Sequence, residues 1–227
     1  MIGCVAQCVR SETPPQARSW SELDKATKHD DDDDDDCAES KKTTDATNEE
    51  SNQLFDATEL MHIQNLWTRV RESKRPFGAY IVVSLVHNQP SLAQLFQIPS
   101  DCHRSSMVEQ DAVQIQGLRI ESFFDDLVSS IQSAPESVVR RLCANVGCIH
   151  YKKGVNFNQH NWSHFQNVVR DEIVRATSMS ESDCTISDDE LHAWNHFLQL
   201  VKEEMNNGFL VAAQRAIALI EDDHHFR

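Results

Sequence analysis

The sequence predicts an all-α protein. Over most of residues 54–220, apolar side chains recur every three or four positions, which is the period of one helix face. No segment alternates apolar and polar residues as a half-buried strand does, and the 227 residues include only 6 glycines. We therefore expect six or seven helices joined by short connections and built around one sizeable core.

Capping residues and prolines mark the ends of several helices. Asp56 with Glu59, and Ser187 with Glu190, are patterns typical of helix starts. Pro76, Pro90 and Pro135 open further elements, Gly154 ends one, and residues 98–106 are expected to form a loop. The expected inner faces are Leu60, Ile63, Trp67 and Val70; Ile81, Val82, Leu85 and Val86; Leu92, Leu95 and Phe96; Val113, Gln116, Ile120, Phe124, Leu127, Val128 and Ile131; Val138, Val139, Leu142 and Val146; Trp162, Phe165, Val168, Val169 and Ile173; and Leu191, Trp194, Phe197, Leu198, Val201 and Met205.

Charge and composition divide the chain into three parts. Residues 1–53 carry 14 acidic and 6 basic side chains, including the run Asp30–Asp36, and are expected to be a disordered acidic tail. Residues 54–210 form the expected folded domain, and residues 211–227 a helical extension. The net charge of −15 comes without the basic stripe of a nucleic-acid-binding protein, and it does not favour anionic membranes.

The 7 cysteines form no regular framework, which favours free thiols in a reducing compartment. No signal-peptide pattern and no membrane-spanning apolar stretch is seen, so a cytoplasmic location is expected. Cys4 and Cys8 are candidate acylation sites, although a tail with two free thiols is the simpler interpretation. Cys143 and Cys148 either sense redox state or are ordinary core or surface residues.

The short motifs of common enzyme classes are absent: there is no glycine-rich phosphate loop, no nucleophile elbow and no HExxH zinc motif. Two histidine pairs at helical spacing, His160 with His164 and His192 with His196, have the geometry to chelate a metal ion. Exposed histidines on a helix face are the simpler interpretation of both pairs. A binding role is favoured over an enzymatic one, and catalysis stays open.

The stretch VGCIHYKKGV, from Val146 to Val155, resembles the end of the globin F helix and the corner that follows it. In that family the last-turn histidine binds the haem iron and a nearby valine packs against the porphyrin edge; His150 and Val155 match these positions. Upstream, QGLRI is similar to the globin E-helix pentad, which usually reads His-Gly-x-Lys-Val. This match gives Gln116 the distal position, Arg119 the basic position near the haem propionates, and Ile120 the apolar position one turn later.

Further globin landmarks occur in the expected order, and the resemblance covers about residues 54–210. Matching positions are Trp67 in the A helix, Gly78 and Val82 in the B helix, Pro90 and Phe96 around the C helix, and residues 194–209 in the H helix. Two departures stand out. The distal residue is glutamine rather than the commoner histidine, and the interval of 34 residues between Gln116 and His150 is longer than in oxygen-storage globins.

The resemblance implies a haem b cofactor with His150 as the proximal iron ligand. The expected apolar walls are Val82, Phe96, Ile120, Leu142, Val146 and Val155. The other ring nitrogen of His150 should donate to a carbonyl or hydroxyl one turn back. Gln116 is placed to stabilise bound O₂, and CO and NO are further ligands. Three roles stay open: O₂ transport, storage or sensing; redox, electron-transfer or NO chemistry with a partner reductase; and a haem-free interaction protein.

Overall fold

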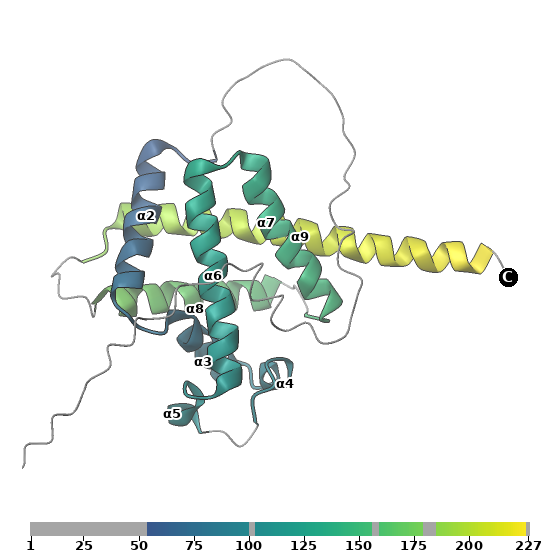
Figure 1. The fold of residues 1–227 in the computed structure, drawn as a ribbon, viewed down its shortest axis with the longest axis horizontal. Coiled ribbons are helices and arrows are strands. Elements are labelled where there is room, and N and C mark those ends of the chain that lie inside the picture. Colours follow the sequence, from purple (N-terminus) through teal and green to yellow (C-terminus); the bar gives the residue numbers. More distant parts are fainter. Residues whose placement is uncertain (1–53, 100–102, 156–158, 179–184, 226–227) are drawn as a thin grey trace, which may run out of the picture.

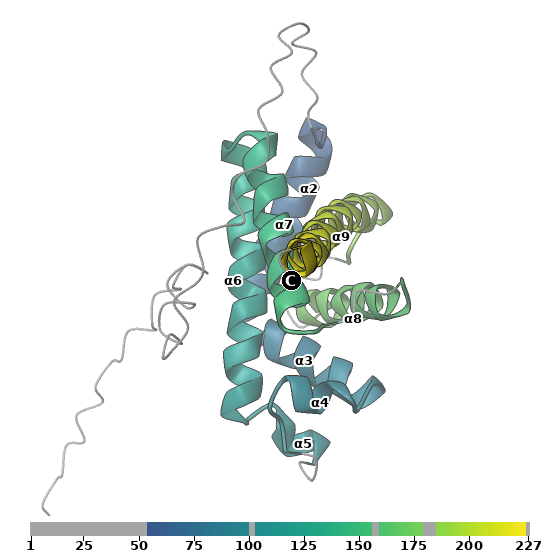
Figure 2. The same ribbon diagram turned by 90° about the vertical axis from the view of Figure 1, so that its right-hand side faces the viewer.

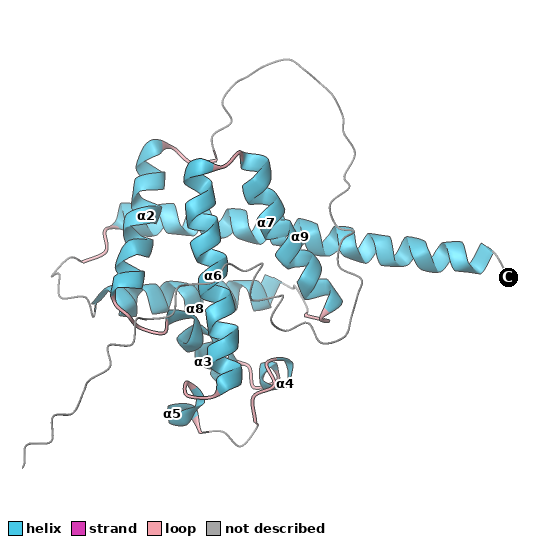
Figure 3. Ribbon diagram, viewed as in Figure 1, coloured by secondary structure: helices cyan, strands magenta, loops and turns pink. Residues whose placement is uncertain are grey.

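A computed structural model describes residues 54–99, 103–155, 159–178 and 185–225 (Figure 1). These residues form eight helices, and no strand occurs among them (Figure 3). The helices are α2 (Ala57–Glu72), α3 (Phe77–Asn88), α4 (Leu92–Leu95), α5 (Arg104–Met107), α6 (Asp111–Ser133), α7 (Glu136–Lys152), α8 (Gln159–Ser178) and α9 (Asp188–His225). The tail expected at residues 1–53, with Asp30–Asp36, Cys4 and Cys8, lies outside the described residues.

The long helices cross in two layers. Figure 1 and the side view in Figure 2 show α2, α6 and α7 side by side, with α8 and α9 running across them as the second layer. The most extensive helix interface joins α7 to α9, and α3 packs against both α6 and α8. The short helices α4 and α5 lie beside the lower end of α6, and the last turns of α9 project beyond the other helices (Figure 1).

An aromatic cluster fills the space where the two layers meet. Trp67 of α2 stacks on Trp194 of α9, with ring centroids 6.0 Å apart and planes inclined by 12°. Phe77, Phe124 and Phe197 surround this pair and are almost completely buried. All five lie on helix faces or helix starts that carry the apolar period, so the all-α class predicted from that period is confirmed.

Glycine allows two helix pairs to cross at backbone contact. A Cβ built on Gly78 of α3 would lie 2.0 Å from the carbonyl oxygen of Gly117 in α6. A Cβ on Gly147 of α7 would lie 1.9 Å from the carbonyl oxygen of Met205 in α9, and Gly208 makes the reciprocal contact one turn later. At both crossings the main chains themselves therefore set the distance between the helices.

Both capping patterns predicted from the sequence are present. The Asp56 carboxylate accepts from the Glu59 backbone N–H at 2.8 Å, and the Glu59 side chain accepts in return from Asp56. The Ser187 hydroxyl accepts from the Glu190 backbone N–H at 3.2 Å, while Glu190 accepts from Ser187 at 2.9 Å. Each cap satisfies backbone donors that the first turn of a helix leaves without an intrahelical partner.

One detail of the predicted elements needs correction, and one glycine has a role that the sequence did not indicate. The loop expected at residues 98–106 runs only to the start of α5, because Met107 is buried in a small apolar cluster with Val113 and anchors an extra helical turn. Gly208 lies inside α9, which is continuous to His225, so the predicted extension from residue 211 starts within this helix. The role of Gly208 is the close contact with α7, since its neighbour across the crossing is the Ala144 carbonyl.

The cap of α9 makes the stability of the fold depend on pH. Partial burial raises the pKa of Glu190, but hydrogen bonds from Ser187 and the charge of Arg69, 2.7 Å away, outweigh it and lower the pKa below 4.5. The stabilisation is therefore present above pH 4.5 and is lost as the pH falls below it. We expect Glu190→Gln to lower the free energy of unfolding by about 1 kcal/mol at pH 7. The difference in the free energy of unfolding between the variant and wild type should become smaller toward pH 4.

Urea denaturation at pH 7, 5 and 4 measures this gap. Glu203→Gln is the matched control, because Glu203 is an exposed carboxylate on the same helix. A constant difference between Glu190→Gln and wild type across these pH values would contradict the assignment of the pH dependence to this carboxylate.

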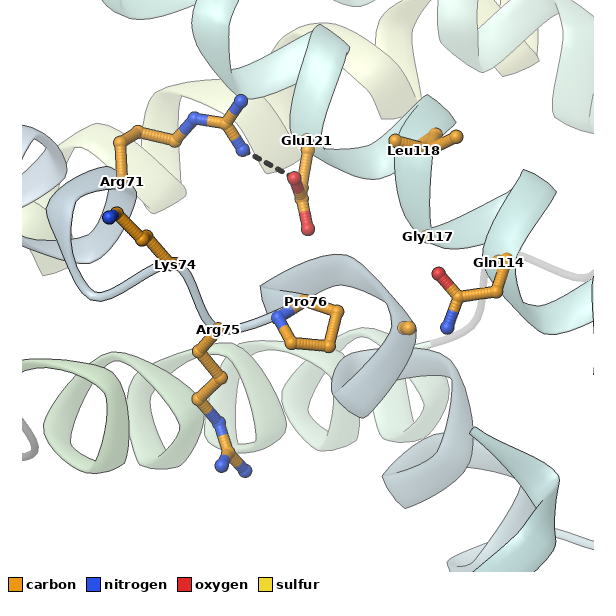
Figure 4. Close-up of a pocket in the computed structure, with 9 residues that line it drawn as sticks. Arg71, Lys74, Arg75, Pro76, Gln114, Gly117, Leu118 and Glu121 are labelled. Carbon is orange, nitrogen blue, oxygen red and sulfur yellow. Dashed lines mark hydrogen bonds and ion pairs between the residues drawn. The ribbon is translucent and has the colours of Figure 1, made fainter. Parts of the chain in front are cut away.

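A polar hollow lies between the α2–α3 turn and α6 (Figure 4). Glu121, only 8% exposed, accepts hydrogen bonds from Arg71 and from the backbone N–H of Gly78, the latter at 2.9 Å. Arg75 points away from the hollow and donates to Glu172 of α8 at 3.0 Å. These ion pairs and hydrogen bonds hold the start of α3 against both α6 and α8.

Candidate functional site

An apolar cavity lies between α6 and the end of α7. Its volume is about 1050 Å³ with open solvent included. Residues from α3, α4, α8 and α9 complete the walls. The lining comprises Leu85, Gln89, Leu92, Leu95, Phe96, Gln116, Arg119, Ile120, Phe123, Phe124, Val146, His150, Val155, Asn161, Trp162, His164, Phe165 and Met205. Most of these side chains are apolar, which suits a hydrophobic ligand.

His150 faces this cavity from the last turn of α7. Its Nδ1 lies 2.7 Å from the carbonyl oxygen of Val146, one turn earlier. Because a carbonyl only accepts, Nδ1 carries the hydrogen and donates, and the lone pair of the ring is on Nε2. Burial lowers the pKa of His150 below 6.5, against the opposing effect of the Val146 carbonyl. The ring is therefore neutral at pH 7, which is the form that binds a metal ion.

The end of α7 is shaped to hold His150 in place. Gly154 has a φ of +70°, a left-handed conformation in which glycine is favoured, and it follows the last residues of the helix. The chain then turns back, so that the Val155 N–H donates to the His150 carbonyl at 2.9 Å and Val155 lines the cavity. The Tyr151 ring packs edge-on against Phe209, with centroids 5.3 Å apart, and fixes this turn against α9.

Three residues of the QGLRI segment line the cavity from α6: Gln116, Arg119 and Ile120. Arg119 and Ile120 lie three and four residues after Gln116, on the same side of the helix. The Arg119 guanidinium donates to the side-chain oxygen of Gln116 over 3.4 Å. Because Arg119 donates to the oxygen of the Gln116 amide, the nitrogen is the part of this amide that can donate to a further group.

The structure brings together most of the predicted site residues. Phe96, Val146 and Val155 line the cavity together with His150 and the three QGLRI residues of α6. Val82 and Leu142 do not line it. Val82 is fully buried in the small cluster that also holds Val113. Leu142 packs against the main core two turns before His150. Both follow the apolar period correctly, but that period does not distinguish a core residue from a wall residue.

Several wall residues were missed by the sequence analysis. Phe123 and Phe124 continue the α6 face one turn after Ile120, so the same helical spacing could have identified them. Trp162, His164 and Phe165 come from the start of α8, which follows a connection whose path the sequence does not reveal. Their contribution to the cavity depends on how α8 packs against α3.

Neither cysteine of α7 is suited to redox sensing. Cys143 and Cys148 form no disulfide, and their exposed fractions are 0% and 6%. Burial, with a smaller contribution from Glu204, raises the pKa of the Cys143 thiol to about 12. Because the thiolate is the reactive form, Cys143 is unreactive at neutral pH. The structure favours the core interpretation of both residues over the redox one.

The two histidines at helical spacing do not act together as a metal site in either of the predicted pairs. His160 is exposed whereas His164 lines the cavity, and His196 lies 2.8 Å from the carboxylate of Glu59. Within the described ranges, no three His, Cys, Asp or Glu side chains gather in a group able to hold a metal ion. None of the described helices has the length and apolar character needed to cross a membrane.

The family model described as Globin matches residues 81–205, which is more than half of the chain. The chain is a globin. Globin-like protein Glb-12 from C. elegans has a similar solved structure, with a TM-score of 0.59 and 20% identity, covering 74% of this globin and 98% of that chain. A hexa-coordinate haemoglobin and a globin, both from Drosophila melanogaster, give TM-scores of 0.56 and 0.54 at 14% and 15% identity. Each covers 66% of this globin and 93% of its own chain.

A comparison with curated protein sequences finds no match. The family match starts within α3 and ends in α9, so it includes every helix that contributes to the cavity. The predicted globin fold, with helices around a pocket, is confirmed. In this globin the pocket lies between the helix that carries Gln116 and the helix that carries His150.

Proposed function

We propose that this globin binds haem b with His150 as the proximal iron ligand and takes up O₂ reversibly on the Gln116 side. The observation that carries the proposal is the hydrogen bond from His150 Nδ1 to Val146 inside an apolar cavity. It fixes the tautomer and the orientation of the ring, as second partners of metal-binding histidines generally do. When bound, haem supplies the iron atom to which a diatomic ligand attaches.

The other wall residues fit a porphyrin. Phe96, Ile120 and Val146 offer apolar contacts to its flat faces, and their burial by the ligand supplies most of the affinity through the hydrophobic effect. Arg119 is the basic residue of the lining and would pair with a propionate. The family match and the hexa-coordinate haemoglobin from Drosophila melanogaster support a haem ligand for this fold.

Absorption spectra of the purified chain titrated with haem test the proposal. We expect a Soret band that saturates at one haem per chain and a single broad visible band in the ferrous form that splits into two under O₂ or CO. No stoichiometric uptake would contradict the proposal and favour a haem-free interaction protein. Two sharp bands in the ligand-free ferrous form would contradict the open O₂ site and favour electron transfer with a partner reductase.

Gln116 is expected to slow the release of O₂. Bound O₂ carries partial negative charge, and the Gln116 amide nitrogen can donate to it. Replacement by leucine removes a hydrogen bond worth about 1–2 kcal/mol, so Gln116→Leu should release O₂ roughly 5 to 30 times faster. Release of CO should change much less, because bound CO carries less charge.

Stopped-flow measurement of O₂ and CO dissociation gives both rates on the same sample. Gln132→Leu serves as control, because Gln132 is exposed near the far end of α6. Equal O₂ release from Gln116→Leu and wild type would argue against a hydrogen bond from this position.

A further inference from the structure

His164 is a second imidazole in the cavity wall. It lies on the second turn of α8 and lines the cavity together with Asn161, Trp162 and Phe165. Its Nε2 is buried, and no hydrogen-bond partner for this atom exists within the described part of the chain. His160, one turn earlier on the same helix, is exposed. The two histidines of this pair therefore occupy different environments.

A buried polar nitrogen without a partner destabilises a fold, and native proteins rarely keep one without a reason. A leucine or phenylalanine at this position would fill the same wall without leaving a buried nitrogen unpaired. The orphaned nitrogen instead indicates that the occupant of the cavity supplies the missing partner.

We propose that His164 is a haem-binding residue whose Nε2 bonds to the bound haem. This inference rests on the haem-binding part of the proposed function, independently of its open O₂ site, and adds a contact from α8, which carries none of the residues that the globin resemblance assigns. An imidazole nitrogen has two possible partners on haem: a propionate oxygen, to which an N–H donates, and the iron, to which the lone pair binds. With either partner, loss of His164 should weaken the retention of haem. The two partners are distinguished by the ferric absorption spectrum.

The test compares His164→Leu with the control His160→Leu in the full chain. Without haem, His164→Leu should resist urea at least as well as wild type, because the unpaired nitrogen is gone. With haem, it should transfer haem to an excess of a scavenging apoprotein at least about tenfold faster than wild type, since losing a partner of a metal centre typically costs 10- to 100-fold. His160→Leu should match wild type in both measurements.

The ferric spectrum then identifies the partner. A low-spin, six-coordinate wild type that becomes high-spin in His164→Leu places Nε2 on the iron. An unchanged spin state with faster loss of haem places it on a propionate, and His164→Gln, which can still donate, should then restore part of the retention. Equal haem retention and equal spectra in His164→Leu and wild type would overturn this inference alone. Absence of haem uptake by the wild type would overturn the proposed function as well.

Discussion

Replacing His150 by alanine is expected to abolish the stoichiometric haem complex. Nε2 of this ring holds the lone pair that would bind the iron. The described helix α7 contains no second histidine that could replace it. Removal of the ring should also leave the fold intact, because the His150 side chain is only partly buried and Val146, whose carbonyl it contacts, keeps its place in α7. Haem titration followed at the Soret band, with far-ultraviolet circular dichroism of the apoprotein, separates loss of the ligand from loss of the fold.

A cavity variant strengthens this experiment. In His150→Gly, added imidazole should occupy the vacated space and restore the haem spectrum, whereas a variant damaged in its fold would not respond. His192→Ala is a suitable control, since His192 is exposed on α9 and far from the lining. Full haem uptake by His150→Ala with an unchanged spectrum would require another proximal ligand.

Gly147→Ala is expected to destabilise the fold severely. In a helix interior this change normally stabilises by about 1 kcal/mol, because alanine is the better helix former. Here the new methyl group would lie 1.9 Å from the Met205 carbonyl oxygen and 2.7 Å from its carbon, both in the backbone of α9. Backbone atoms cannot rotate away as a side chain can, so α7 must separate from α9. We expect a loss of at least about 3 kcal/mol in the free energy of unfolding.

The same change should disturb the haem site, since Gly147 lies one turn before His150. Urea denaturation of the apoprotein and the haem-transfer rate measure the two effects. Asn145→Ala is the control, because Asn145 is exposed on the same helix and has no such contact. Gly208→Ala should reproduce the result from the other side of the crossing, where its methyl group would meet the Ala144 carbonyl oxygen at 1.9 Å. Stability equal to or above that of wild type in both variants would mean that the helices are not in backbone contact.

The fold was predictable to the extent that local patterns determine it. Apolar spacing located the long helices, and the side chains of Asp56 and Ser187 marked two of their starts correctly. Short-range patterns failed where tertiary contacts decide the outcome. The turn of α5 depends on burial of Met107, and the need for glycine at position 208 comes from its contact with the backbone of α7.

The candidate site was predictable only in part for a related reason. His150, Gln116 and Phe96 were found because each belongs to a segment with its own recognisable order of residues. Val82 and Leu142 were placed in the wall, although they do not line the cavity, since an apolar residue at helical spacing carries no information about depth. His164 was interpreted as an exposed residue because its burial arises from the packing of α8, which no local pattern encodes.

The two glycine crossings have a mechanical consequence. A helix that rests on side chains can slide or tilt as rotamers change, but a helix in backbone contact with its neighbour has no such compliance. The helix bearing Gln116 is joined in this rigid way to α3, and the helix bearing His150 to α9. Each of these two walls of the slot is therefore stiff. The softest wall is the short α4 segment, none of whose residues is buried, so a ligand that needs room must gain it there.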